Sequence, residues 1–298
     1  MTEPPRQVPN RVYLLLGFMV FVWSMNFAVA KLALKEFPAL LLGSLRFTVA
    51  GAILFVVYLW RRRSGKTQPV ERDEFWKLLG IGLVGVGLNQ ITFLLGLTRT
   101  SVGHASILIC VTPVIVLLLS SWIGHEHLSH RKFLGFGLAV SGILVLQGRA
   151  LLTGHGSMLG DLFVVLAATT FSIFTVGGKH MRHQFDSVTM MTFAYTGSGV
   201  VLFPVTYWLG SQFAFEKVSW LGWAAVLYMA VFPSIVAYLI FYHALRYLSS
   251  SRLSMLSYLQ PFLATLFAIP LLGEKVTASL VAGGMLVIAG VWWSERTA

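Results

Sequence analysis

The sequence predicts an all-α polytopic membrane protein with ten transmembrane helices, arranged as two inverted five-helix repeats. Of its 298 residues, 56% are hydrophobic and only 11% are charged, whereas a soluble domain carries roughly 25% charged residues. Apolar stretches of about 20 residues, enough to cross a hydrocarbon core of ~30 Å, recur along the chain. An internal duplication predicts the division into two halves.

The duplication is visible as residues that recur at a constant offset of 148 positions. Prolines, glycines and acidic residues take part, so the match is more than a shared apolar composition. The repeated pairs include Pro113/Pro261, Glu126/Glu274, Gly135/Gly283, Gly142/Gly290, Ser106/Ser254 and Trp23/Phe171. The chain is therefore a tandem repeat of one unit.

Ten spans follow from the apolar stretches and the loops between them. They are expected at 12–30, 39–60, 75–97, 102–123, 131–148, 158–178, 187–210, 219–245, 252–272 and 277–294. The expected divisions are a tail at 1–11, a first repeat at 12–148, a linker at 149–157, a second repeat at 158–294 and a tail at 295–298. No signal-peptide cleavage site follows the first apolar stretch, so we interpret it as a retained span.

Because each unit has five spans, the second unit enters the membrane from the opposite side. This is the inverted-repeat plan of many transporters. If the N-terminus is cytoplasmic, more than twice as many Lys and Arg residues fall in cytoplasmic segments as in external ones, in keeping with the positive-inside rule. We therefore expect both termini in the cytoplasm. The basic excess then reflects membrane topology, and no nucleic-acid partner is expected.

Polar and aromatic side chains in several spans predict a central cavity, because buried polar groups in a membrane face protein or water. Many of them share helix faces at i, i+3 or i+4 spacing. The expected substrate-binding residues are Trp23, Asn26, Arg46, Asn89, Gln90, Phe93, Ser106, Phe171, Phe174, Tyr238, Ser254 and Tyr258. Proline frees a backbone carbonyl and bends a helix, so Pro113, Pro233 and Pro261 are expected to act as hinges.

Arg46 is the most deeply placed ionisable residue of the chain. A charge near the middle of a bilayer costs roughly 3 kcal/mol on insertion scales. Two explanations remain open: its guanidinium binds a substrate carboxylate, or it extends towards the membrane surface or bridges helices. The buried Ser and Asn residues likewise have a second explanation, as hydrogen bonds between helices.

No Asp or Glu lies deep in any span. Proton- and sodium-coupled carriers usually hold a buried carboxylate at the relay site, so facilitated or weakly coupled transport is favoured. A histidine relay is the alternative, with His104 and His243 as candidates. Because both lie near span ends while Ser106 is mid-span, an intramembrane serine protease is disfavoured. We expect no catalytic residue, no metal site and no cofactor.

The stretch from Leu97 to Gly142, with its second copy from Leu245 to Gly290, resembles the EamA-type repeat of the drug/metabolite transporter superfamily. Further matching segments are Trp23-Ser24-Met25-Asn26-Phe27, Leu45-Arg46-Phe47 and Gly160-Asp161. The resemblance covers nearly the whole chain. The first copy departs from the usual Leu-Gly-Glu with Gly124-His125-Glu126, whereas the second keeps Leu272-Gly273-Glu274.

The resemblance implies a central cavity lined mainly by spans 1–4 and 6–9. It also implies export of amino acids or other metabolites, and one branch of the family exports aromatic amino acids. We therefore expect a transporter of the cell inner membrane that exports neutral, apolar or aromatic amino acids and related metabolites by alternating access. Its expected partners are the substrate and the lipid bilayer. The protein itself is expected to be a monomer or weak homodimer. Carriers of phosphorylated or nucleotide-linked sugars, or of drug-like organic cations, are the alternative.

Overall fold

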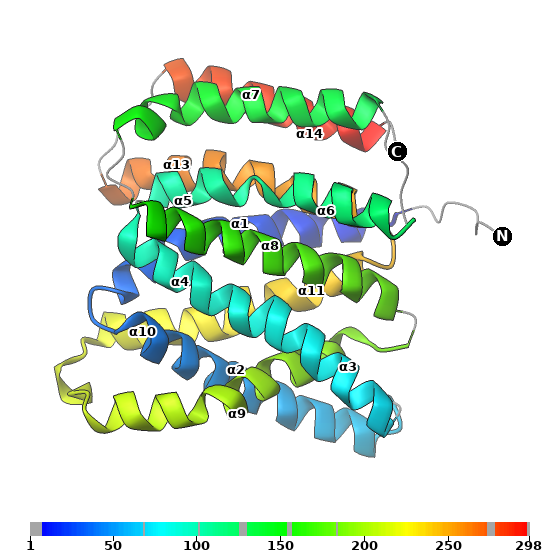
Figure 1. Ribbon diagram of the computed structural model, residues 1–298, viewed down its shortest axis with the longest axis vertical. Coiled ribbons are helices and arrows are strands. Elements are labelled where there is room, and N and C mark those ends of the chain that lie inside the picture. Colours follow the sequence, from blue (N-terminus) through cyan, green and yellow to red (C-terminus); the bar gives the residue numbers. More distant parts are fainter. Residues whose placement is uncertain are drawn as a thin grey trace.

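The computed structural model describes residues 8–67, 69–100, 102–124, 130–153, 157–182, 184–272 and 278–296. All regular structure in these residues is helical (Figure 1). Seven helical segments among them are long and apolar enough to cross a membrane, and shorter apolar helices accompany them. The predicted all-α membrane fold is confirmed. Glu126 and Glu274 lie outside the described residues.

The first repeat holds spans 1 to 5. These are α1 (Asn10–Ala33), α2 (Ala39–Arg63), the continuous segment α3 (Arg72–Gly82), η1 (Leu83–Leu88) and α4 (Asn89–Arg99), the broken span α5 (Val102–Ile109) and α6 (Thr112–Trp122), and α7 (His130–Thr153). Each begins within a few residues of the boundary expected from the sequence.

The second repeat holds spans 6 to 10. These are α8 (Met158–Met181), α9 (Ser187–Ser211), the segment α10 (Trp220–Met229), η3 (Ala230–Val236) and α11 (Ala237–Ala244), the segment α12 (Ser250–Met255), η4 (Leu256–Tyr258) and α13 (Leu259–Leu272), and α14 (Ala278–Arg296). A short 3₁₀ turn, η2 (Phe215–Lys217), lies in the loop before α10.

Side chains at the loop ends cap several of these helices. The first N–H groups of a helix have no partner within it, and short polar side chains satisfy them. Ser157 Oγ accepts a hydrogen bond from Gly160 N at 3.0 Å. Asp186 Oδ1 accepts one from Val188 N at 2.9 Å. These caps fix where α8 and α9 begin, immediately after the loops.

Spans 3 and 8 are interrupted by π-helical turns at equivalent positions of the two repeats. The turns are η1 and η3, and Gly85 in η1 corresponds to Pro233 in η3. A Cβ atom on Gly85 would lie 2.1 Å from the Cβ of Phe174, so only glycine lets α8 approach this closely. A π turn changes the direction of the side chains that follow it, and such turns are frequent at functional sites.

The helices pack in layers across the bundle (Figure 1). At one edge, α7 packs along α14, and a Cβ on Gly142 would lie only 2.7 Å from the carbonyl of Gly283. At the other edge α2 packs along α9, while α1, α4, α8, α11 and α13 fill the middle. The start of α1 and the end of α14 lie on the same side of the bundle (Figure 1), as an even number of spans requires.

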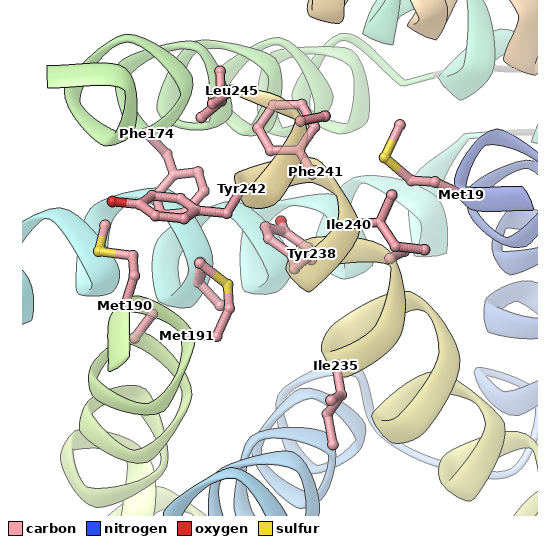
Figure 2. Close-up of a cluster of buried hydrophobic side chains, with 14 of the residues drawn as sticks. Met19, Phe174, Met190, Met191, Ile235, Tyr238, Ile240, Phe241, Tyr242 and Leu245 are labelled. Carbon is pink, nitrogen blue, oxygen red and sulfur yellow. The ribbon is translucent and has the colours of Figure 1, made fainter. Parts of the chain in front are cut away.

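A cluster of aromatic and methionine side chains fills the interior where α8, α9 and α11 meet (Figure 2). Its aromatic members include Phe174, Tyr238 and Phe241, and Met190 and Met191 belong to the same cluster. Methionine fills irregular gaps between rings and makes favourable sulfur–aromatic contacts. This cluster forms a rigid wall next to the central cavity described below.

Two lysines at equivalent positions brace the two repeats. Lys31 Nζ donates to the carbonyls of Leu97 at 2.6 Å and Thr100 at 2.9 Å, at the end of α4. Lys179 Nζ donates in the same way to the carbonyls that follow α11, those of Leu245 and Leu248. A cation at a helix C-terminus satisfies carbonyls and complements the helix dipole. Because the repeats are inverted, the braces lie at opposite membrane surfaces.

We predict that Lys31→Met and Lys179→Met each lower stability by about 2 kcal/mol, because each removes two charge-assisted hydrogen bonds to backbone carbonyls. Thermal unfolding of the purified protein in detergent measures the effect. The exposed Lys35, which has no such contact among the described residues, supplies the control Lys35→Met. Equal midpoints for all three variants would show that the braces contribute nothing.

Candidate substrate-binding site

A cavity of about 80 Å³ lies between the two repeats, where spans 1, 2, 3, 4, 6, 8 and 9 approach one another. A volume of this size holds about three water molecules. Its lining residues are Trp23, Asn26, Phe27, Arg46, Asn89, Gln90, Phe93, Ile109, Thr112, Phe171, Tyr238, Ser257 and Gln260. Both repeats contribute to it, so it lies where a transporter with inverted repeats binds its substrate.

The cavity lies on the pseudo-two-fold axis that relates the repeats. Gln90 and Tyr238 occupy equivalent positions, and Gln90 Nε2 donates to the Tyr238 hydroxyl at 3.1 Å. Trp23 and Phe171 are also equivalent, and their ring centroids are 5.7 Å apart. Equivalent residues meet only at the axis. Because the members of each pair differ chemically, the centre of a nearly symmetric fold is itself asymmetric.

Arg46 belongs to a hydrogen-bond network that joins four spans. Its Nε donates to Ser234 Oγ at 2.5 Å and its Nη1 to Gln90 Oε1 at 2.7 Å. From Gln90 the network continues through Tyr238, whose hydroxyl donates to Asn89 Oδ1 at 3.3 Å. Asn89 Nδ2 in turn donates to the carbonyl of Ala167 at 2.8 Å. The network fixes the orientation of these polar side chains at the cavity wall.

The guanidinium of Arg46 carries a charge with no counterion in the described part of the chain. The residue is 1% exposed, and its partners there are a hydroxyl and an amide, both neutral. Removing an ion from water costs several kcal/mol unless an opposite charge compensates. Arg46 therefore does not extend to the membrane surface. It bridges spans 2, 3 and 8, and it offers a positive charge to the cavity.

Asn26 presents an unsatisfied acceptor to the same cavity. Its Oδ1 atom is buried and has no hydrogen-bond partner among the described residues. A buried polar atom left in this state costs about 1–3 kcal/mol, so a donor from a bound molecule would recover that free energy. Asn26 lies one helical turn after Trp23 on α1, which places both side chains on the cavity side.

Aromatic rings form the apolar part of the wall. Trp23 Nε1 donates to the carbonyl of Pro233 at 3.2 Å, which fixes the indole between the repeats. Phe27 and Phe93 are in edge-to-face contact at 5.2 Å. Aromatic pairs in this geometry add about 0.5–1.5 kcal/mol beyond their buried area. The cavity thus combines one cation, several amides and rigid aromatic surfaces.

The repeated prolines also shape the cavity. A proline at position i removes the donor for the carbonyl of residue i−4. For Pro113 and Pro261 these residues are Ile109 and Ser257, and both line the cavity. The chain leaves α-helical geometry just before each proline, between α5 and α6 and at η4. Pro233 lies inside η3, so all three expected hinges lie at or near an interruption.

Eight of the twelve residues expected at the site line the cavity, and four do not. The eight are Trp23, Asn26, Arg46, Asn89, Gln90, Phe93, Phe171 and Tyr238. Phe174 instead packs on Gly85, and Tyr258 packs against Phe136 of α7 at 6.2 Å. Ser106 and Ser254 are fully buried, and Ser254 Oγ donates to the carbonyl of Ser251.

Five lining residues were not among those expected: Phe27, Ile109, Thr112, Ser257 and Gln260. A signal for four of them is present in the sequence. Thr112 and Gln260 each precede the repeated proline, and Ile109 and Ser257 lie four residues before it. The residue before a proline is pushed out of the helical region. The same two positions of each repeat therefore line the cavity, next to an interruption of the helix.

His243 does not line this cavity. Its ring contacts Tyr247 at 5.4 Å, near the end of α11. The side chain of His104 lies outside the described residues. No described carboxylate lines the cavity either.

The fold and the cavity define the class of protein as a multi-pass membrane transporter. A family model described as the EamA-like transporter family matches residues 10–147 and again residues 158–295. The chain therefore belongs to the EamA-like transporter family, within the drug/metabolite transporter superfamily.

Several known proteins are similar over nearly their whole length. An uncharacterized transporter of Archaeoglobus fulgidus is 29% identical over 289 residues, covering 95% of this chain and 96% of its own. A probable amino-acid metabolite efflux pump of Salmonella typhimurium is 27% identical over 288 residues, covering 92% and 91%. A solved crystal structure superposes with a TM-score of 0.77 at 21% identity, covering 97% and 99%, and shows the same fold.

We predict that Tyr238→Phe lowers stability by about 1–3 kcal/mol, because it leaves the amides of Gln90 and Asn89 without their shared hydroxyl. The ring that contacts Trp23 is retained. The matched control is Tyr207→Phe, at an exposed position of α9. The unfolding midpoints of the two purified variants test this, and a midpoint for Tyr238→Phe as high as that of the control would contradict it.

Proposed function

We propose that this transporter exports neutral amino acids with apolar or aromatic side chains, and related small metabolites, across the cytoplasmic membrane. One observation carries the proposal. The guanidinium of Arg46, which has no counterion among the described residues, and the unsatisfied Oδ1 of Asn26 line the same small cavity. An amino acid carries the complementary pair, a carboxylate and an ammonium group, on a single carbon atom.

In the proposed complex the substrate carboxylate binds the guanidinium of Arg46. Charge-assisted hydrogen bonds of this kind are roughly twice as strong as neutral ones, and the carboxylate supplies the missing counterion. The ammonium group donates to Asn26 Oδ1. The carbonyl of Ile109, whose helical donor is missing because residue 113 is proline, is a further acceptor for it.

The rings around the cavity favour an apolar or aromatic substrate side chain. Trp23 contacts Phe171, and Phe27 contacts Phe93. These rings are therefore held in place by one another and not by the substrate. A preformed apolar surface lowers the ordering cost of binding. This supports neutral amino acids over charged ones, whose side chains would have no partner among the described lining residues.

The other substrates expected for this superfamily fit the lining less well. A phosphate or nucleotide group carries more than one charge, and Arg46 is the only cationic residue among the described lining residues. An organic cation would be repelled by the like charge of Arg46, and the described lining holds no carboxylate to offset that repulsion. The related probable amino-acid metabolite efflux pump supports both the substrate class and the direction.

The proposed mechanism is alternating access around the central cavity. The lysine braces hold α1 to the end of α4 and α8 to the end of α11, so each pair moves as a unit. The interruptions near the prolines supply the flexible points. The described lining lacks a carboxylate for proton or sodium relay, so transport is facilitated or weakly coupled. The basic loops favour an orientation with both termini in the cytoplasm. The proposed transporter is a monomer or weak homodimer.

We predict that purified protein in liposomes accelerates counterflow of neutral amino acids. Vesicles loaded with unlabelled phenylalanine should take up labelled phenylalanine faster than empty liposomes, and leucine and tryptophan should compete. A pH gradient should alter the rate little. If a broad panel of neutral amino acids shows no flux above empty liposomes, the proposed substrate class is wrong. A steep dependence on the gradient would instead contradict facilitated transport.

We further predict that two substitutions show which residue binds the carboxylate of the substrate and which binds its ammonium group. In wild-type vesicles, 2-phenylethylamine and 3-phenylpropionate should each compete roughly 10–100-fold more weakly than phenylalanine, because each loses one charge-assisted hydrogen bond. Arg46→Gln should abolish the preference for phenylalanine over 2-phenylethylamine. Asn26→Leu should abolish the preference for phenylalanine over 3-phenylpropionate.

Two controls accompany this measurement. Arg46→Lys retains the charge and should retain part of the preference over the amine, and Arg99→Gln changes an exposed arginine at the end of α4. If Arg46→Gln still prefers phenylalanine over 2-phenylethylamine as strongly as Arg99→Gln does, Arg46 is not the carboxylate site.

A further inference from the structure

A second cavity of about 290 Å³ lies on the outside of the bundle, between α2, α3 and α9. Phe55 and Tyr58 of α2 form one wall, and Phe75 and Leu79 of α3 form the other. The floor is α9 from Thr192 to Val201. It shares no lining residue with the central cavity, so the substrate proposal does not account for it.

The surface of this groove is apolar although two threonines line it. Thr192 Oγ1 donates to the carbonyls of Leu54 at 3.2 Å and Val188 at 2.7 Å. Thr196 Oγ1 donates to the carbonyl of Gly51 at 3.2 Å. With their hydroxyls bound to backbone carbonyls, both threonines present methyl groups to the groove. Such a surface favours hydrocarbon over a polar molecule.

The length of the groove matches one leaflet of a bilayer. The lining residues of α9 lie within a stretch of ten residues, from 192 to 201, whose nine rises of 1.5 Å correspond to about 14 Å. A hydrocarbon core is ~30 Å thick, so one leaflet spans roughly 15 Å. Phe55, Phe75, Val200 and Val201 are all exposed on the surface of the bundle. A single acyl chain therefore fits along the groove.

Arginines lie at the end of the groove nearest the α2–α3 loop. Arg61 follows Tyr58 by three residues on α2, and Arg72 precedes Phe75 by three residues on α3, so helical register places both above the groove walls. Arg61 Nε is buried and has no hydrogen-bond partner among the described residues. Arg61 Nη2 also forms an ion pair with Asp186 Oδ1 at 3.9 Å, and both side chains are partly exposed.

Exposed tryptophans place this end of the groove at the membrane surface. Trp60 and Trp76 are both largely exposed, at the end of α2 and in the first turns of α3. Lys66 lies over the Trp60 ring at 5.3 Å. Tryptophan is enriched at the level of lipid headgroups. The two arginines are thus at headgroup depth, with the hydrocarbon groove directly beneath them.

We propose that this groove is a binding site for an anionic phospholipid. One acyl chain lies along α9 between α2 and α3, and the anionic headgroup, through its phosphate, contacts Arg61 and Arg72. The charges at the mouth and the apolar groove beneath select this one occupant. A neutral lipid offers no negative charge to the two arginines, and a soluble anion leaves the groove unfilled.

The test is lipid binding to the full-length protein, purified in detergent, delipidated and examined by native mass spectrometry. Phosphatidylglycerol and phosphatidylcholine with identical acyl chains are titrated in parallel. Each arginine near a membrane surface contributes roughly fivefold to the binding of an anionic lipid. The double variant Arg61→Gln/Arg72→Gln should therefore bind phosphatidylglycerol about 25-fold more weakly, with phosphatidylcholine almost unchanged.

The control for charge is Arg63→Gln/Lys77→Gln, which removes two exposed cations of the same segment that lie off the groove faces by helical register. It should change the affinity less than twofold. The control for shape compares Val201→Trp, which fills the groove, with Phe203→Trp, an exposed position of α9 outside it. Only Val201→Trp should weaken binding of both lipids.

The proposal is overturned if both double variants lose phosphatidylglycerol equally, because the effect is then one of general charge. It is also overturned if Val201→Trp and Phe203→Trp bind lipid with equal affinity, or if the groove is occupied by a second copy of the chain. In that last outcome the spectra show a dimer that Val201→Trp disrupts. Unfolding midpoints in phosphatidylcholine check that all four variants are folded.

Discussion

The central site depends on one buried, uncompensated charge. The guanidinium of Arg46 is almost fully removed from solvent, and its described partners are neutral groups from spans 3 and 8. Such a charge is costly unless hydrogen bonds satisfy its donors and an opposite charge compensates it. The network through Gln90, Tyr238 and Asn89 supplies the hydrogen bonds, and the proposed substrate carboxylate supplies the opposite charge. Because that network joins both repeats, the proposed mechanism links occupancy of the site to their relative position.

The duplication explains why this charge lies at the centre of the bundle. Inverted repeats place equivalent residues on opposite sides of an axis, and residues close to the axis meet their own counterparts. Gln90 meets Tyr238 and Trp23 meets Phe171 in this way. Features away from the axis remain duplicated, as the braces of Lys31 and Lys179 show. The symmetric parts build the frame, and the asymmetric pairs at the axis give the cavity its chemistry.

Much of the fold and part of the site follow from the sequence, because membrane helices have strong constraints of length and polarity. The ten spans are of this kind, and so are Arg46 and Asn26, whose polarity in an apolar stretch requires a partner. Aromatic residues were harder to place. Phe171 and Phe174 lie one turn apart, yet only Phe171 lines the cavity, since Phe174 fills the space left by Gly85. Nothing in the local sequence distinguishes a ring that faces a cavity from one that packs on glycine.

The sequence by itself determined the membrane class, the five-plus-five repeat and the inverted topology, because an odd number of spans per unit reverses the second unit. It also placed the prolines that interrupt spans 4 and 9. Only the tertiary structure decided which faces of those spans meet. The π turns of spans 3 and 8 rotate the side chains that follow them, and close packing at glycine sets the helix separation. Those two effects bring Arg46, Gln90 and Tyr238 together across the axis, and they depend on neighbours that are distant in the chain.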